Sequence, residues 1–197
     1  MAIGTLVLSC ADSAKKTQNA TSENSSKAKT NIEKIDPFKK RQEELKRMEP
    51  ISFESLKSWL PSTLGGLPLK SAKSLFPMFE GQAEVRGVYG EPGMKENISL
   101  ILMDAAGPHG DSFSNQIQEF KKEIPDKEVD GIQMKSALKV KNWFVRQDYN
   151  SNVDQTHISF FHDERVMIKL DASNFNVEES WDLIGELDFR KLSELAK

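Results

Sequence analysis

Four strand-like segments follow one another in the second half of this 197-residue chain, with no helical segment between any two of them. They cover residues 129–138, 140–149, 156–162 and 165–171. The last two alternate apolar with polar residues, as half-buried strands do. Between them, Asp163 and Glu164 leave room for a tight two-residue hairpin turn. A run of strands that does not alternate one for one with helices predicts an α+β fold and argues against a doubly wound parallel sheet.

Helices are predicted for much of the remaining chain, and capping residues and prolines mark their ends. Asp36 and Pro37 begin the first of them, because Asp caps a helix and Pro is favoured at the first helical position. Apolar spacing predicts helices over residues 38–48, 53–60, 112–124, 177–186 and 189–195. Strands 82–89 and 97–104 form a further hairpin, and residues 62–69 are predicted to be a loop from their Gly and Pro content. We therefore expect an antiparallel sheet of about six strands with helices packed on one face.

Composition limits the classes of protein to which the chain can belong. Residues 36–197 are enough for a single α+β domain with a core that needs no disulfides. The one cysteine, Cys10, allows no intramolecular disulfide and no cysteine-based metal site. Residues 51–197 carry 17 Lys or Arg against 23 Asp or Glu. An acidic domain without a stripe of basic and aromatic residues is a poor nucleic-acid binder, so no nucleic-acid partner is expected.

A polar segment of the N-terminal region separates this domain from Cys10. Residues 11–31 contain no aromatic residue and no Val, Leu, Ile or Met, so they cannot bury enough apolar surface to offset the entropy of ordering. We predict a disordered tether over residues 10–35. Twenty such residues have a root-mean-square span of about 25 Å.

The run Leu6-Val7-Leu8-Ser9-Cys10 resembles the lipobox of bacterial lipoproteins. The resemblance implies that residues 1–9 are a remnant signal peptide and that the Cys10 thiol carries a lipid. It places the protein in the cell envelope, anchored on the periplasmic or outer side of a bacterial membrane. The order of elements from about residue 52 to 195, ending in a strand hairpin and a helix, is similar to that of uncharacterised envelope lipoproteins. That similarity concerns architecture and implies no catalytic residue.

The loop from Asp104 to Ser112 is the one segment that looks like a site. Its glycines let backbone approach a ligand, and the following helix offers free N–H groups to an anion, although the charge of Asp111 repels phosphate. Asp104, His109 and Asp111 could instead bind a divalent ion, which is the second interpretation. The third is a turn in which Asp111 and Ser112 cap the helix.

No motif for a cofactor or a nucleophile is present, and no acid–base pair can be identified from spacing. His157 and His162 are five residues apart in one strand, so they point to opposite faces and cannot share a metal. The leading hypothesis is a noncatalytic envelope protein that binds another protein or supports assembly. It predicts an exposed apolar or aromatic patch on the helix-free sheet face, formed by Trp143, Tyr149 or Phe161. The alternatives are a small-molecule or lipid-binding lipoprotein with an enclosed pocket, and an enzyme that uses the Asp104–Asp111 loop.

Overall fold

The computed structural model describes residues 36–75, 83–91, 96–108 and 111–197. The predicted signal remnant (residues 1–9), the lipidation residue Cys10 and the tether over residues 10–35 lie outside the described residues. Contacts along the chain divide it into two units, residues 1–34 and residues 35–197. All of the described residues belong to the second unit, which is the folded domain.

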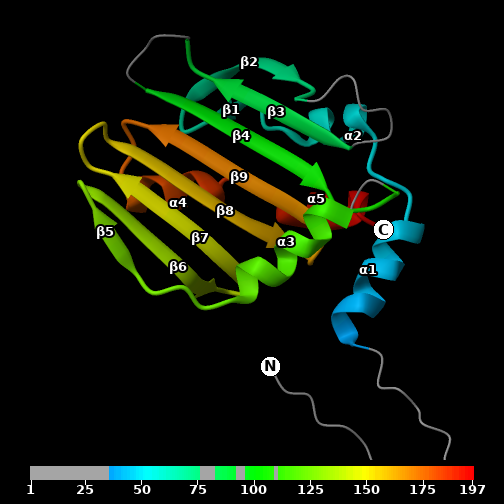
Figure 1. The fold of residues 1–197 in the computed structure, drawn as a ribbon. Coiled ribbons are helices and arrows are strands. Elements are labelled where there is room, and N and C mark those ends of the chain that lie inside the picture. The colour runs from blue at the N-terminus through cyan, green and yellow to red at the C-terminus, as the bar shows by residue number, and fades with distance from the viewer. Residues whose placement is uncertain (1–35, 76–82, 92–95, 109–110) are drawn as a thin grey trace, which may run out of the picture. The chain divides into compact units, whose positions relative to one another are not determined.

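A single antiparallel sheet runs through the domain (Figure 1). In the described residues it has nine strands in the order β1-β2-β3-β4-β9-β8-β7-β6-β5. The strands are β1 (Thr63–Leu64), β2 (Leu67–Lys73), β3 (Glu84–Tyr89), β4 (Asn97–Asp104), β5 (Lys127–Val129), β6 (Ile132–Val140), β7 (Trp143–Asn150), β8 (Gln155–His162) and β9 (Val166–Ser173). The predicted α+β class is confirmed, but the predicted number of about six strands is wrong.

Two hairpins account for the additional strands. Gly65 and Gly66 turn the predicted loop back on itself as β1 and β2, with φ of 58° and 75°. Asp130 and Gly131, with φ of 50° and 78°, turn the chain within the predicted strand 129–138, so that β5, which lies mostly before that strand, pairs with β6. Two consecutive residues with positive φ form the type I′ turn, whose twist matches that of paired strands. Both turns therefore create strand pairs where the apolar pattern alone shows one segment or none.

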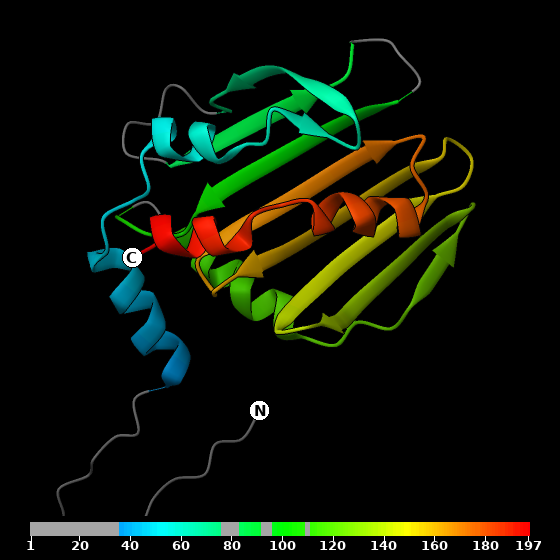
Figure 2. The ribbon, with the colours of Figure 1, turned by 180° about the vertical axis from the view of Figure 1, so that it is seen from behind.

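In the part of the chain that the structure describes, five helices pack on the sheet, and they cover both of its faces. They are α1 (Pro37–Arg47), α2 (Phe53–Trp59), α3 (Asp111–Lys121), α4 (Val177–Gly185) and α5 (Phe189–Leu195). Helices α2, α4 and α5 lie over one face, as Figure 2 shows, whereas α3 lies across the other (Figure 1). The expectation of helices on one face only is therefore wrong.

The reason is that the central strands are apolar on both sides at one end. The larger core lies under α2, α4 and α5 and includes Leu100, Phe160 and Ile168, which are fully buried. On the opposite face, Met103, Phe161 and Met167 are also buried, and they pack against Ile117 of α3 and Leu45 of α1. Apolar side chains on this second face need cover from water, which α1 and α3 provide.

Candidate functional site

Of the three residues of the predicted site at residues 104–112, the structure describes only the side chain of Asp104. Its carboxylate already has four hydrogen-bond donors. Asp104 is 2% exposed, and its two oxygens accept hydrogen bonds from Nε and Nη2 of Arg165, both at 2.8 Å. The backbone N–H groups of Ile51 and Ala106 donate to the same carboxylate at 2.9 and 3.0 Å. Four donors around one buried carboxylate leave no room for a ligand, so Asp104 joins chain segments together.

The other two residues of that predicted site cannot be placed beside Asp104. His109 lies outside the described residues. Asp111 begins α3, but its side chain is outside what the structure describes. The proposals of a ligand-binding or metal-binding loop therefore stay predictions.

Arg165 also connects this cluster to the segment that follows α1 and to the end of α5. Besides Asp104, its guanidinium donates to the carbonyl oxygens of Glu49, at 2.9 Å, and Ala196. Its side chain is 4% exposed. Sequence reasoning missed this cluster because Arg165 and Asp104 are 61 residues apart, and neither residue stands in a recognisable motif.

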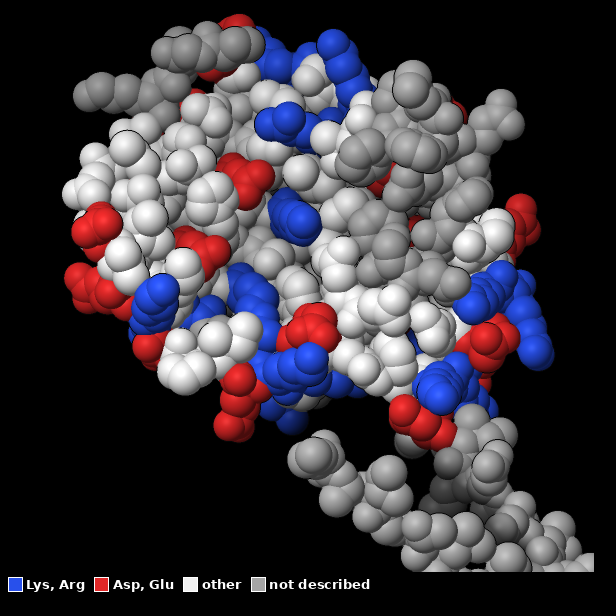
Figure 3. All heavy atoms as spheres, viewed as in Figure 1, with Lys and Arg blue, Asp and Glu red and all other residues white. Residues whose placement is uncertain are grey.

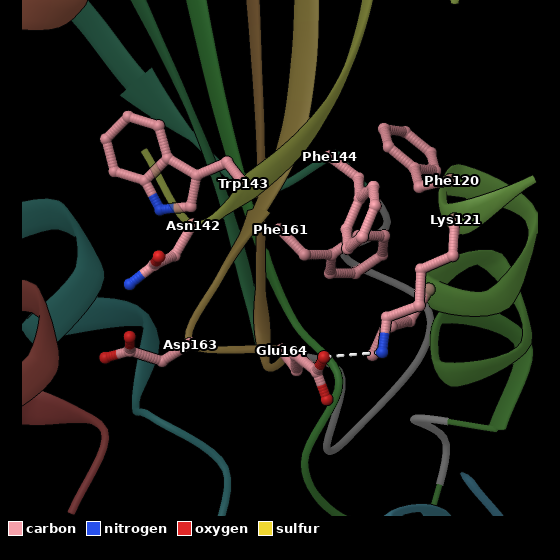
Figure 4. Close-up of a pocket in the computed structure, with 9 residues that line it drawn as sticks. Phe120, Lys121, Asn142, Trp143, Phe144, Phe161, Asp163 and Glu164 are labelled. Carbon is pink, nitrogen blue, oxygen red and sulfur yellow. Dashed lines mark hydrogen bonds and ion pairs between the residues drawn. The ribbon is translucent and has the colours of Figure 1, made fainter. Parts of the chain in front are cut away.

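A pocket of about 200 Å³ lies at one end of the sheet, between α3 and two strand turns. Figure 4 shows the rings of Phe120, Phe144 and Phe161 close together on one side of it. Phe120 and Phe161 meet edge to face with ring centroids 5.3 Å apart. The pocket thus has an aromatic floor contributed by α3, β7 and β8.

The rim of this pocket is polar. Lys121 Nζ lies 2.5 Å from Glu164 Oε1, an ion pair that joins α3 to the β8–β9 turn (Figure 4). Asn142, in the β6–β7 turn, and Asp163 also line the pocket. An apolar floor with a few polar groups at its edge is the usual composition of a binding pocket.

The predicted aromatic patch on the open sheet face is not formed by the residues expected to form it. Trp143 is 8% exposed in the larger core, and Phe161 is 6% exposed under α3. Tyr149 is half-buried, and its hydroxyl donates to Asp154 at 3.0 Å. Trp143 and Phe161 line the recessed pocket beside α3 instead.

Serine, histidine and aspartate meet on the other side of the β8–β9 turn, but not as a catalytic triad. His162 Nε2 lies 2.7 Å from Ser193 Oγ and 3.2 Å from Asp163 Oδ2. In a triad the carboxylate holds Nδ1, so that Nε2 is left to take the proton of the serine. Here both partners lie on Nε2, and Ser193 Oγ is also 2.6 Å from the same carboxylate. The cluster therefore lacks the geometry of an activated nucleophile.

A second histidine lies on the face of the sheet that carries α3, where acidic and basic side chains lie beside one another (Figure 3). His157 is paired across the sheet with Asp148 of β7 and with Asp171 of β9. Its Nδ1 lies 2.6 Å from Asp171 Oδ1. As predicted, His157 and His162 are on opposite faces, since His162 packs on Phe189 of α5.

The sequence pattern did not predict that His157 lies between Asp148 and Asp171, because the predicted turn was one residue too short. A two-residue turn at Asp163 and Glu164 would place His157 opposite Leu170. In the structure Arg165 also belongs to the turn, because its side chain is held by Asp104, and its N–H donates to the carbonyl of His162 at 3.0 Å. The three-residue turn shifts the register by one, so that Asp171 faces His157.

The two histidines are expected to affect stability in opposite ways as pH changes. The hydrogen bond to Asp171 raises the pKa of His157 above its usual 6.5, against burial, and the charges of Asp171 and Asp148 add to the rise. Protonated His157 therefore stabilises the fold below about pH 6.5, and this contribution is lost as pH rises through the raised pKa. Burial lowers the pKa of His162. The stability that the fold has while His162 is neutral is therefore lost as pH falls below 6.5.

Proton NMR titration of the imidazole resonances checks this prediction. We expect one histidine to titrate above 6.5 and another below it, assigned by His157→Gln and His162→Gln. Asp171→Asn should lower the pKa of His157. In urea unfolding, His157→Gln should be destabilising at about pH 5.5 and neutral at about pH 8.5. A loss of unfolding free energy that is the same at both pH values would contradict the assigned role of Asp171.

No cluster of three or more His, Cys, Asp or Glu side chains that could hold a metal occurs in the described parts of the chain. Within the same residues, no helix has the length and apolar character needed to cross a membrane.

Comparison with known proteins gives no match: no family model, no curated protein and no solved structure is similar to this chain.

Proposed function

We propose that this protein is a noncatalytic protein-binding module of the bacterial cell envelope, anchored to a membrane by a lipid on Cys10. The proposal joins two features, the lipobox-like run that ends at Cys10 and the pocket beside α3. The partner is another protein that presents an apolar side chain to this pocket.

The size of the pocket is the observation that carries the proposal. Small-molecule sites usually enclose about 300–1,000 Å³, whereas this pocket encloses about 200 Å³, and the Lys121–Glu164 ion pair separates it from a neighbouring hollow of about 270 Å³. A hollow of this size, with three phenylalanine rings and a polar rim, suits one large apolar side chain from a partner. Protein interfaces concentrate their binding energy in such anchors. The small-molecule alternative lacks this support, and the enzyme alternative is weakened because Asp104 is fully engaged by Arg165 and backbone donors.

Site-specific photocrosslinking in intact cells tests the binding function. A photoreactive amino acid is placed at Asn142, which is exposed on the rim of the pocket. The matched control carries it at Glu54, an exposed position on α2. We expect one protein to crosslink in near-stoichiometric yield from position 142 and not from position 54. Equal crosslinking from both positions would show that the pocket is not the binding site.

The anchor is tested separately, with the full-length chain and its Cys10→Ala variant. Cells are fed an alkyne-labelled fatty acid, and the purified protein is examined for label. We expect label on the native chain and none on Cys10→Ala, together with loss of the crosslinked partner from the variant. An unlabelled native chain would remove the argument for an envelope location and leave the pocket argument standing.

A further inference from the structure

A second hollow lies next to the first, between α1 and α3. It has a volume of about 270 Å³, and Phe38 and Leu45 of α1 contribute to its apolar lining. Three residues line both hollows: Ile117, Lys121 and Glu164. The two hollows are therefore neighbours, and the Lys121–Glu164 ion pair belongs to the boundary between them.

This boundary can be opened with little loss of stability. The side chains of Lys121 and Glu164 are 40% and 50% exposed. Ion pairs at such exposed positions contribute little to folding, because water and salt screen them. A ligand that offers either charge a new partner can therefore replace one side of the pair.

Glu164 is the side that gives way more easily. It is an exposed residue of the β8–β9 turn, so its side chain can rotate into solvent. Lys121 is on α3 with residues of both apolar hollows around it, and long cationic side chains keep their stems on such surfaces. Arg41 of α1 lines the second hollow as well, and it donates to the backbone carbonyl of Asp163 at 3.1 Å. Arg41 already pairs with Glu44, and Asp36 and Asp163 also line the hollows, so the cation that Glu164 releases when it turns away is Lys121 alone.

From these contacts we propose that the two hollows and Lys121 form one recognition groove for an acidic peptide segment. The segment belongs to the partner protein, so the inference rests on the proposed function. It carries two apolar side chains, one for each hollow, and between them an Asp or Glu whose carboxylate takes the place of Glu164 on Lys121. Two separate hollows divided by a charged pair suit alternating side chains of a peptide better than one continuous acyl chain.

Selection from a library of random dodecapeptides displayed on phage tests the inference with the full-length chain as bait. We expect enriched peptides to contain an acidic residue between two large apolar residues. Selected peptides are then synthesised and their dissociation constants measured by fluorescence anisotropy. Lys121→Gln should weaken binding about two- to fivefold, the range of an exposed ion pair. Glu164→Gln should strengthen it, because Lys121 is then free.

The opposite signs of these two variants separate recognition from a structural role of the ion pair. Both variants break the Lys121–Glu164 pair, so a structural role alone would move affinity in the same direction for both. Lys122→Gln is the matched control, since Lys122 pairs with Glu119 and lines neither hollow. It should leave affinity unchanged.

Three results would overturn the inference, and they differ in what they say of the proposed function. Enriched peptides with apolar anchors but no acidic residue would reject the inference and keep the protein-binding function. Peptides that bind equally well to Phe144→Asp would place binding outside the groove and reject both. Binding of dodecanoate in place of any peptide would reject both in favour of an anionic lipid.

Discussion

Replacing Arg165 by methionine is expected to lower the free energy of unfolding by about 3–5 kcal/mol, which is typical when one partner of a buried ion pair is removed. Methionine keeps most of the apolar length of the side chain but leaves the Asp104 carboxylate buried without its cation. Asp104 is then held by the two backbone donors of Ile51 and Ala106 alone. The carbonyl groups of Glu49 and Ala196 lose their donor as well.

Urea unfolding followed by tryptophan fluorescence measures this change. Lys40→Met is the matched control, because Lys40 forms an ion pair with Glu44 in which the two side chains are 71% and 48% exposed. Such a pair contributes about 0–1 kcal/mol. The double variant Asp104→Asn with Arg165→Met should regain part of the lost stability, since no unpaired charge is then buried. A loss below about 1 kcal/mol for Arg165→Met would mean that water reaches the ion pair.

Phe160→Ala is expected to lower the free energy of unfolding by a similar amount, about 3–5 kcal/mol. Phe160 is fully buried on β8 beneath α5. Its ring stacks on Trp143 with centroids 4.5 Å apart, and the centroid of the Phe189 ring is 6.0 Å away. Truncation removes these contacts and leaves a cavity that the strand cannot close, because its neighbours are fixed by the sheet.

The same urea experiment, with two controls, tests this expectation. Phe160→Leu keeps most of the volume and should cost about 1.5 kcal/mol or less. Val153→Ala changes a side chain that is 57% exposed and should fall within about 0.5 kcal/mol of the native chain. If Phe160→Ala cost no more than Phe160→Leu, the ring would not be an essential part of the core.

Much of the fold is predictable from local patterns in the sequence. The caps and prolines mark helix ends well: Asp36 and Asn176 accept hydrogen bonds from the first turns of α1 and α4. The strands of the central sheet follow from alternation. What local patterns miss is pairing between short segments, such as β1 with β2, where two glycines with positive φ turn the chain.

The side-chain clusters are harder to predict, because each depends on contacts between distant segments. Asp104 looks like a ligand in the sequence, yet Arg165, from a turn 61 residues later, occupies it. His157 and Asp171 meet only because the β8–β9 turn has three residues. The pocket needs Phe120 from a helix to lie against Phe144 and Phe161 from two strands, which no spacing along the chain reveals. The chemistry of these sites is set by register and packing.

The guanidinium of Arg165 also bears on the order of events during synthesis. It donates to the backbone carbonyls of Glu49 and of Ala196, 116 residues before it and 31 residues after it. On the ribosome, Ala196 emerges long after Glu49 and Asp104. The hydrogen bonds that fasten the segment after α1 to the end of β4 can therefore be complete only when almost the whole domain has left the exit tunnel. Until then, Arg165 cannot hold the segment after α1, the end of β4 and the end of α5 together.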